Sequence, residues 1–189
     1  MARIRTFIAV EIGDDMRKRA VALQERLANS DPDVRWVEPA GMHITLVFLG
    51  EVDEREVMDV CRAVMDLAKK EAPFKLSVAG VGAFPNTRRP KTVWAGITDG
   101  AEALQRIHGL LDEALSDLGG YRKEDRAYTP HLTLGRVNGT GQELIAEFPK
   151  LMSWSGGHTT VNELVVYSSE LTREGPEYTP LGRGHLSGK

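Results

Sequence analysis

The sequence lacks the features of several protein classes. It has a single cysteine, Cys61, so an internal disulfide and a multi-cysteine zinc or iron–sulfur site are both excluded. No uncharged apolar run approaches the ~20 residues that a membrane-spanning helix needs. No charged-then-apolar leader occupies residues 1–10. These absences predict a cytoplasmic protein that does not associate with a membrane.

The chain also lacks an excess of positive charge. It has 24 Lys and Arg against 27 Asp and Glu, for a net charge of −3, which argues against non-specific binding of nucleic acid over a large surface. A local RNA site remains compatible with this balance. Because no Pro-, Gly- or Ser-rich linker divides the 189 residues, we expect 1–189 to form a single domain with two intertwined lobes.

Strands and helices alternate only loosely along the chain, and pairs of strands joined by short turns are frequent. We therefore predict an α+β fold with antiparallel or mixed sheets and outer helices. Runs rich in β-branched and aromatic residues predict strands at 5–12, 43–50, 74–81, 91–98, 131–137 and 161–169, with a final hairpin turning near 174–176. Apolar residues at helical spacing predict helices capped at Asp14, starting at 53–56, spanning 104–118 up to the pair Gly119-Gly120, and at 140–148.

One tetrapeptide pattern occurs twice, as His43-Ile-Thr-Leu46 and His131-Leu-Thr-Leu134. Residues i and i+2 of a strand point to the same face, so each histidine shares a face with the threonine of its own motif. The apolar residues between and after them point to the opposite face, into a core. Each copy therefore presents an imidazole and a hydroxyl together from a rigid backbone.

Two such strands facing one another would suit displacement at phosphorus without a metal. One neutral imidazole can accept a proton from water while the other, protonated, donates to the leaving oxygen. An unperturbed histidine titrates near pH ~6.5, so both forms are accessible near neutrality. The threonine hydroxyls can bind the non-bridging oxygens. An internal duplication with a purely structural role would explain the same repeat.

The other histidines have weaker claims. His158 begins a His-x-Thr sequence but lacks the apolar alternation, and it is interpreted as part of a loop entering a strand. His108 lies beside the apolar stripe of a helix and is interpreted as a packing residue. His185 lies in the glycine-rich tail and is assigned no role.

At the paired motifs the chain resembles the 2H phosphoesterase superfamily, and within it the bacterial and archaeal RNA 2′,3′-cyclic phosphodiesterases, also called 2′-5′ RNA ligase-like proteins. The resemblance extends over nearly the whole chain. Besides the motifs, it rests on Arg5-Thr-Phe-Ile-Ala-Val-Glu11, the Phe-Leu-Gly-Glu51 after the first motif, Gly80-Val-Gly-Ala-Phe-Pro85, Arg89-Pro90, Trp94-Ala-Gly96, Ser169-Glu-Leu171, Gly175 and Tyr178.

This resemblance implies two pseudo-symmetric lobes around a central cleft, with one motif on each lobe. It implies hydrolysis of RNA 2′,3′-cyclic phosphodiester ends to 2′-phosphomonoesters, with neither metal nor cofactor. By analogy His43 would be the proton donor, His131 the proton acceptor, and Thr45 and Thr133 the residues that hold the phosphate. The expected partner is RNA with a 2′,3′-cyclic phosphate end or a small cyclic nucleotide, bound by a monomer.

Further residues near the motifs allow alternative interpretations. Strand alternation places Arg136 on the face opposite Thr133, so binding of phosphate by Arg136 would need a bulge, and a surface ion pair explains it equally well. Phe48 could stack on a base, but its parity favours the core. Tyr128 could line the cleft. A positive cluster could steer a phosphate backbone or be a solvated loop; it comprises Arg88, Arg89 and Lys91.

Three other functions are compatible with the paired motifs. Ligation through a 2′-5′ linkage is the reverse chemistry at the same site, and end-labelled RNA would show which product accumulates. A nucleotide- or RNA-binding module would bind a cyclic nucleotide without turnover. A metal-dependent phosphatase would use the histidines as ligands, but such sites recruit carboxylates and neither motif contains one.

Overall fold

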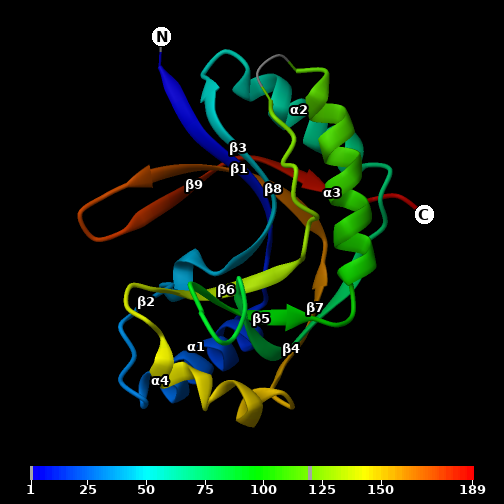
Figure 1. The fold of residues 1–189 in the computed structure, drawn as a ribbon. Coiled ribbons are helices and arrows are strands. Elements are labelled where there is room, and N and C mark those ends of the chain that lie inside the picture. The colour runs from blue at the N-terminus through cyan, green and yellow to red at the C-terminus, as the bar shows by residue number, and fades with distance from the viewer. Residues whose placement is uncertain (1, 119–120) are drawn as a thin grey trace.

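The strands form two antiparallel sheets, one in each lobe (Figure 1). The computed structural model describes residues 2–118 and 121–189. The first sheet has the order β3-β1-β8-β9, formed by His43–Asp53, Arg3–Glu11, Glu163–Leu171 and Pro176–His185. The second has the order β2-β6-β5-β4-β7, formed by Val34–Trp36, His131–Val137, Thr92–Ile97, Phe74–Phe84 and Ser155–Val161.

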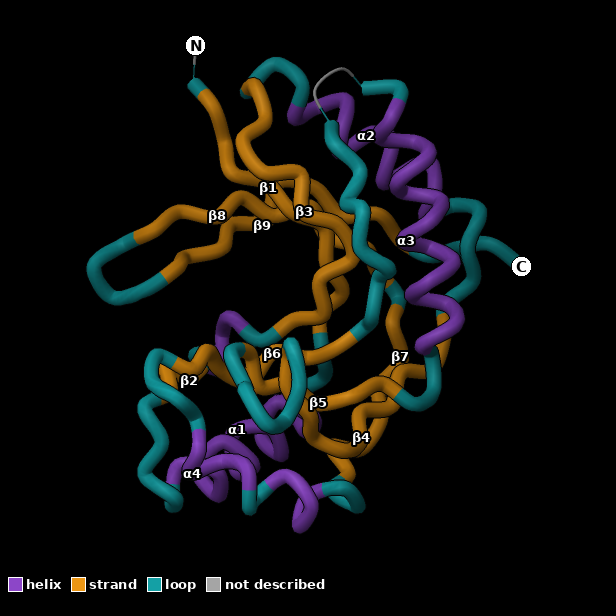
Figure 2. Tube along the Cα trace, in the orientation of Figure 1, coloured by secondary structure: helices purple, strands orange, loops and turns teal. Residues whose placement is uncertain are grey.

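The chain passes repeatedly between the two lobes. Helix α1 (Asp14–Ala28) follows β1 of the first sheet but packs near β7 of the second. Helix α2 (Val57–Ala68) packs on β8 and β9, and α3 (Ala101–Ser116) packs on α2 and β3. The short helices α4 (Gln142–Ile145), η1 (Pro39–Gly41) and η2 (Phe148–Leu151) belong to the second lobe (Figure 2). The predicted bilobal α+β fold with outer helices is confirmed.

The helices form where apolar residues recur at helical spacing, but their first residues differ from the sequence prediction. Helix α1 begins after Gly13, and Asp14 is its first residue, paired with Arg17 rather than capping the backbone. Helix α2 begins after Glu56, because Asp53 still belongs to β3 and its carboxylate binds Arg55 instead. The glycine pair predicted to end α3 lies outside the described residues.

In the last third of the chain, one predicted strand differs at its ends and one assignment was wrong. The strand predicted at 161–169 is β8, which spans Glu163–Leu171, whereas Val161 ends β7. His158 lies within β7, opposite Ser77 of β4, rather than in a loop. The glycines that precede His158 suggested a loop, but the neighbouring strand supplies backbone hydrogen bonds that a short-range pattern does not reveal.

The first sheet is apolar on both of its faces. Its outer face contributes to one large core that extends through both lobes and includes Ile8, Leu46 and Leu132. Its inner face carries a second, smaller cluster formed by Phe7, Ala9, Val165 and Tyr167, with Tyr178 packed against it. This inner cluster is separate from the core on which helices α2 and α3 pack, so the first sheet presents an aromatic surface toward the second lobe.

Among the described residues, no helix combines the length and apolarity required to cross a bilayer.

Trp94 on β5 lies flat across Gly82 of β4, which leaves no room for a side chain there. A methyl group at Gly82 would lie 2.4 Å from the indole ring. We expect Gly82→Ala to lower the free energy of unfolding by about 1–3 kcal/mol, the usual effect of overpacking. Urea denaturation measures this change.

Gly109 is the matched control, because a methyl group there meets nothing within 4 Å and the residue lies within helix α3. Gly109→Ala should raise the free energy of unfolding by about 0.5–1 kcal/mol through helix propensity. Equal effects of the two substitutions would contradict the packing of Trp94 described here.

Candidate active site

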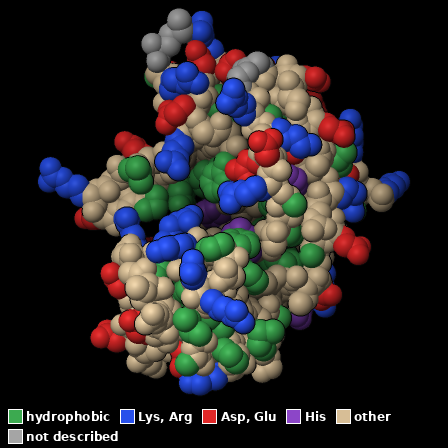
Figure 3. Space-filling view, in the orientation of Figure 1, with side chains coloured by type: hydrophobic (Ala, Val, Ile, Leu, Met, Phe, Trp, Pro, Cys, Tyr) green, Lys and Arg blue, Asp and Glu red, His purple; other side chains and the backbone are tan. Residues whose placement is uncertain are grey.

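A hollow opens between the two lobes (Figure 3). Histidine side chains lie inside it, hydrophobic side chains line its upper wall, and Lys and Arg side chains gather around its mouth. The motif strands β3 and β6 come from different sheets and contact one another. The hollow is therefore bounded by the two strands that carry the repeated motif.

The predicted alternation within each motif is present. His43, Thr45, His131 and Thr133 are partly exposed, whereas the apolar residues between and after them are buried; these are Ile44, Leu46, Leu132 and Leu134. The structure thus brings both imidazole–hydroxyl pairs to the face that the sequence predicts.

Both motif histidines are held in the same way by the backbone. Nδ1 of His43 lies 2.7 Å from the carbonyl oxygen of Gly41, and Nδ1 of His131 lies 2.7 Å from that of Thr129. Because a carbonyl oxygen only accepts hydrogen bonds, Nδ1 carries a proton in each ring. Nε2 of each neutral ring is therefore an acceptor, and that of His43 lies 3.0 Å from the hydroxyl oxygen of Thr45.

The environment favours the neutral form of both imidazoles. Burial lowers the pKa of His43 from 6.5 to about 4, opposed by the hydrogen bond to Gly41, while the charge of His131 lowers it further. Burial also lowers the pKa of His131, and the charge of Arg136 adds to this effect. The effect of His131 on the pKa of His43 and the contact between strands β3 and β6 are consistent with two rings in one site.

Aromatic rings surround the histidines. Phe7 stacks on the His43 ring with centroids 4.9 Å apart, and Tyr178 meets the same ring edge-on at 5.2 Å. Phe84 meets the His131 ring edge-on at 4.9 Å. These contacts fix the planes of the imidazoles and help to exclude water from them.

The prediction that Phe48 lies in the core was wrong. Strand β3 contains a β-bulge at Leu46. Thr45 and Val47 pair with consecutive residues of β1, which leaves Leu46 between them without a partner. A bulge adds one residue and reverses the alternation that follows it. Phe48 is therefore 51% exposed, and its ring lies 6.0 Å from that of Phe7 on the inner face.

A second bulge occupies the same position in the second motif. Leu134 has no partner between the residues of β6 that pair with Val93 and Trp94. The alternation therefore reverses here too, and Arg136 shares the face of Thr133. It pairs with Thr92 in β5, and its Nη1 donates to the Thr92 hydroxyl at 3.2 Å. The bulge that binding of phosphate by Arg136 would require is present.

Side chains from helices α3 and α1 donate to the carbonyl of each bulge residue. Nδ1 of His108 on α3 lies 2.7 Å from the Leu46 oxygen, and Nε2 of Gln24 on α1 lies 2.8 Å from the Leu134 oxygen. The hydroxyl of Tyr128 donates to the carbonyl oxygen of Thr45 at 2.8 Å. Since β3 is at the edge of its sheet, His108 and Tyr128 replace donors that a neighbouring strand would supply.

His108 is itself held from both sides. Its ring stacks on Tyr128 at 4.2 Å, and its Nε2 lies 3.4 Å from a carboxylate oxygen of Asp112, which is only 2% exposed. The hydroxyl of Tyr121 donates to the same carboxylate, and the ammonium of Lys123 lies 3.4 Å from it. His108 is thus a packing residue, as expected, and also a hydrogen-bond donor to the first motif.

Sequence reasoning missed the roles of Gln24 and Asp112. Both lie on the buried face of a helix, Gln24 beside Leu23 and Asp112 beside Leu111. A polar residue inside an apolar stripe is the signal that could have identified them, because a buried polar group requires a partner.

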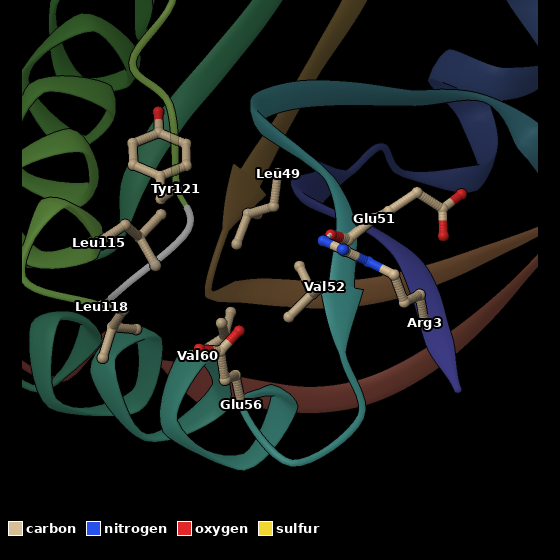
Figure 4. A pocket seen from close by; sticks show the side chains of 9 residues that line it. All are labelled: Arg3, Leu49, Glu51, Val52, Glu56, Val60, Leu115, Leu118 and Tyr121. Atoms are coloured by element: carbon tan, nitrogen blue, oxygen red, sulfur yellow. Dashed lines mark hydrogen bonds between the residues drawn. The ribbon is translucent and has the colours of Figure 1, made fainter. Parts of the chain in front are cut away.

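A separate small pocket lies among β3, α2 and α3 (Figure 4). It contains no residue of either motif and is lined mainly by apolar side chains, with charged groups at one edge: Arg3, Leu49, Glu51, Val52, Glu56, Val60, Leu115, Leu118 and Tyr121. Because both repeated motifs bound the hollow between the lobes and neither lines this pocket, the hollow is the stronger candidate for an active site.

Known proteins match this chain over most of its length. A family model described as LigT like Phosphoesterase matches residues 10–94 and 96–178, so each half contains one motif. The RNA 2′,3′-cyclic phosphodiesterase of Archaeoglobus fulgidus is 36% identical over 94% of this chain and 98% of its own length. The protein of the same name from Methanothermobacter thermautotrophicus is 35% identical over 95% and 97%, respectively.

Solved structures share the fold. The crystal structure of the Thermus thermophilus protein TT0787 covers 98% of this chain and 100% of its own, with a TM-score of 0.85 and 30% identity. Escherichia coli LigT, crystallised with 3′-AMP, covers 98% and 99% with a TM-score of 0.77 and 23% identity. The expectation of a 2H phosphoesterase enzyme is confirmed by the family match.

The buried His43 ring should make stability depend on pH. Its pKa of about 4 in the folded state lies below the ordinary value of 6.5, so the unfolded chain binds its proton first as pH falls. The contribution of neutral His43 to the free energy of unfolding is therefore complete above pH ~6.5. It is lost as the pH falls toward 4, by ~3 kcal/mol in all. The free energy of unfolding, measured by urea denaturation, should therefore fall less between pH 7 and pH 4 in His43→Gln than in the wild-type protein. The expected difference between the two proteins is ~3 kcal/mol. Identical differences for both proteins would contradict the burial of this ring.

Proposed function

This chain belongs to the LigT-like phosphoesterase family, and on that premise we propose that it hydrolyses RNA 2′,3′-cyclic phosphodiester ends to 2′-phosphomonoesters. The observation that carries the proposal is the pair of imidazoles in one hollow, each with Nδ1 bound to a carbonyl oxygen and Nε2 left for chemistry. Relatives at 35% and 36% identity bear the name of this activity.

The proposed reaction is a displacement of the 3′-oxygen by water. Nε2 of His131 accepts a proton from water, whose oxygen attacks phosphorus. The bond from phosphorus to the 3′-oxygen breaks, and that oxygen takes the proton from Nε2 of His43. The 2′-oxygen keeps the phosphate, and proton exchange with solvent resets the two rings.

His43 must be protonated to act as this donor, although burial lowers its pKa to about 4. A cyclic phosphodiester brings a negative charge beside the ring and so raises the pKa of His43. The hydroxyl of Thr45, 3.0 Å from Nε2, can accept a hydrogen bond from the protonated ring until the leaving oxygen replaces it. Substrate binding thus prepares the acid, and no metal takes part in the proposed step.

Other residues on the same faces bind the substrate in this scheme. The hydroxyls of Thr45 and Thr133 hold the non-bridging oxygens, and the guanidinium of Arg136 stabilises the charge that develops on them. The exposed ring of Phe48 offers a stacking surface for the terminal base. The stacking is a consequence of the bulge in β3.

The first experiment uses an RNA oligonucleotide that ends in a 2′,3′-cyclic phosphate. Incubation with the protein and a chelator should give a 2′-phosphate end, identified by chromatography against 2′- and 3′-phosphate standards. His43→Ala and His131→Ala should each lower kcat by about 10²–10⁴, the contribution of a general acid or base.

His158→Ala is the matched control, because this histidine also begins a His-x-Thr sequence but lies exposed on β7 in the second sheet. It should leave kcat unchanged. A 3′-phosphate product, or full activity in either motif variant, would contradict the proposal. An oligonucleotide with a free 5′-hydroxyl in the same reaction reveals ligation as a lengthened product.

The pH dependence should differ between kcat/KM and kcat. Both histidines have lowered pKa values in the free enzyme, so the bell-shaped profile of kcat/KM should have its maximum below pH 6.5. The bound anion raises both pKa values, so the maximum of kcat should lie at higher pH. Steady-state rates between pH 4 and pH 9 test this, and coincident maxima would show that the substrate does not alter the ionisation of the two rings.

A further inference from the structure

We infer that Arg35 and Arg5, at the mouth of the hollow, bind the phosphodiester that precedes the terminal nucleotide of an RNA substrate. This inference rests on the proposed function and extends it, because it distinguishes an RNA end from a cyclic mononucleotide. The ligand group is a single backbone phosphate, recognised by charge and by guanidinium hydrogen bonds.

Arg35 and Arg136 are direct neighbours across two antiparallel strands. They are partners in the pairing of β2 with β6, so their Cβ atoms are about 4.5–5.5 Å apart and point to the same face. Their neighbours Val34 and Trp36 pack against the core instead, which leaves both arginines on the face of Thr133. Directly opposed like charges destabilise a sheet unless an anion lies between them.

Arg5 approaches from the other lobe. It alternates with Phe7 along β1 and so shares the inner face of the first sheet. Burial raises the pKa of Tyr178, and the charges of Arg136 and Arg5 oppose that rise. Tyr178 packs edge-on against Phe7 on this same inner face, with ring centroids 5.1 Å apart.

The hairpin of β8 and β9 connects these groups. Gly175 lies in the turn of this hairpin, and a methyl group added there would lie 3.6 Å from Nη2 of Arg35. A methyl group added at Gly41 would lie 3.3 Å from the ring of Tyr178. The hairpin thus extends from the first sheet toward β2 and η1 of the second lobe (Figure 2). It holds Tyr178 and the turn against the cationic edge of the hollow.

Within the described residues, no carboxylate neutralises these three cations. The ion pairs within 4 Å in that part of the chain include none with Arg5, Arg35 or Arg136. Glu51 lies opposite Arg5 in β3 without forming such a pair. Several other arginines near a carboxylate in this protein do form one, as Arg183 does with Glu11 and Glu163.

Arg35 lies further from the motif histidines than Arg136 does, at the distance along the sheet where a second phosphate would follow the first. His131 and Arg136 lie on β6, and Arg35 lies one strand further out, at the edge of the second sheet. With the cyclic phosphate at the histidines, the chain leaves through the 5′-oxygen of the terminal ribose, and its next charged group is the preceding phosphodiester. A cyclic mononucleotide with a 5′-hydroxyl lacks this group.

The test compares three substrates that share the same terminal nucleotide with a 2′,3′-cyclic phosphate. They are the mononucleotide, the dinucleotide, and the dinucleotide with an uncharged methylphosphonate as its internal linkage. The wild-type protein should show about tenfold higher kcat/KM for the dinucleotide than for either of the others. Arg35→Gln and Arg5→Gln should each remove most of that preference and leave the mononucleotide rate unchanged.

Salt dependence gives an independent measurement. Loss of one phosphate contact should reduce the slope of log kcat/KM against log salt by about 0.7 for the dinucleotide. Arg106→Gln is the matched control, because Arg106 lies on α3 and pairs with Glu71 away from both motifs. It should keep the wild-type preference and slope.

The outcomes separate this inference from the proposed function. Two outcomes overturn the phosphate subsite and leave the proposed function intact. One is hydrolysis of all three substrates at equal rates. The other is a preference for the dinucleotide that survives in Arg35→Gln, in Arg5→Gln and in the charge reversal Arg35→Glu. Absence of hydrolysis of every substrate by the wild-type protein overturns the proposed function itself.

Discussion

The hydrogen bond from Nδ1 of each motif histidine to the carbonyl oxygen two residues earlier governs the rest of the site. It assigns the tautomer of both rings, and it directs both Nε2 atoms away from the backbone. The same contact is repeated in two lobes that share no sheet, so the pseudo-symmetry of the fold reaches individual atoms. Each ring is then set against an aromatic neighbour, Phe7 in one lobe and Phe84 in the other.

The paired bulges explain how two similar motifs form a site with unlike walls. After Leu46 and after Leu134 the alternation reverses, so the residue five positions after each histidine turns to the inner face. That residue is Phe48 in the first lobe and Arg136 in the second. One wall therefore offers an aromatic surface and the other a positive charge, which are complementary to the base and the phosphate of a nucleotide. The same bulge in two strands thus turns two different side chains toward the hollow.

The bulges need support because they interrupt ladder hydrogen bonds. Most of the buried polar side chains meet this need, since Gln24 donates to the Leu134 carbonyl and Asp112 holds the histidine that donates to Leu46. In the second lobe, the backbone of Val37 also donates to Leu134 at 2.9 Å. In the first lobe β3 is an edge strand, so side chains supply the donors. The helices consequently do more than cover the sheets, because their few buried polar groups stabilise the backbone of the motifs.

The two motifs, the face that each presents, the α+β class and most strands and helices can be predicted from the sequence. These follow from periodicity, since apolar residues at spacing 2 or 3.6 dictate which side of an element is buried. The faces of Phe48 and Arg136 depend on the folded sheets, because a bulge is defined by the pairing with a neighbouring strand and leaves no mark in local alternation. The tertiary structure also decides the partners of Gln24, His108 and Asp112, and it brings Arg5 and Arg35 to one opening. Gln24 with Leu134 and His108 with Leu46 join residues far apart in the chain, so no local pattern encodes these contacts.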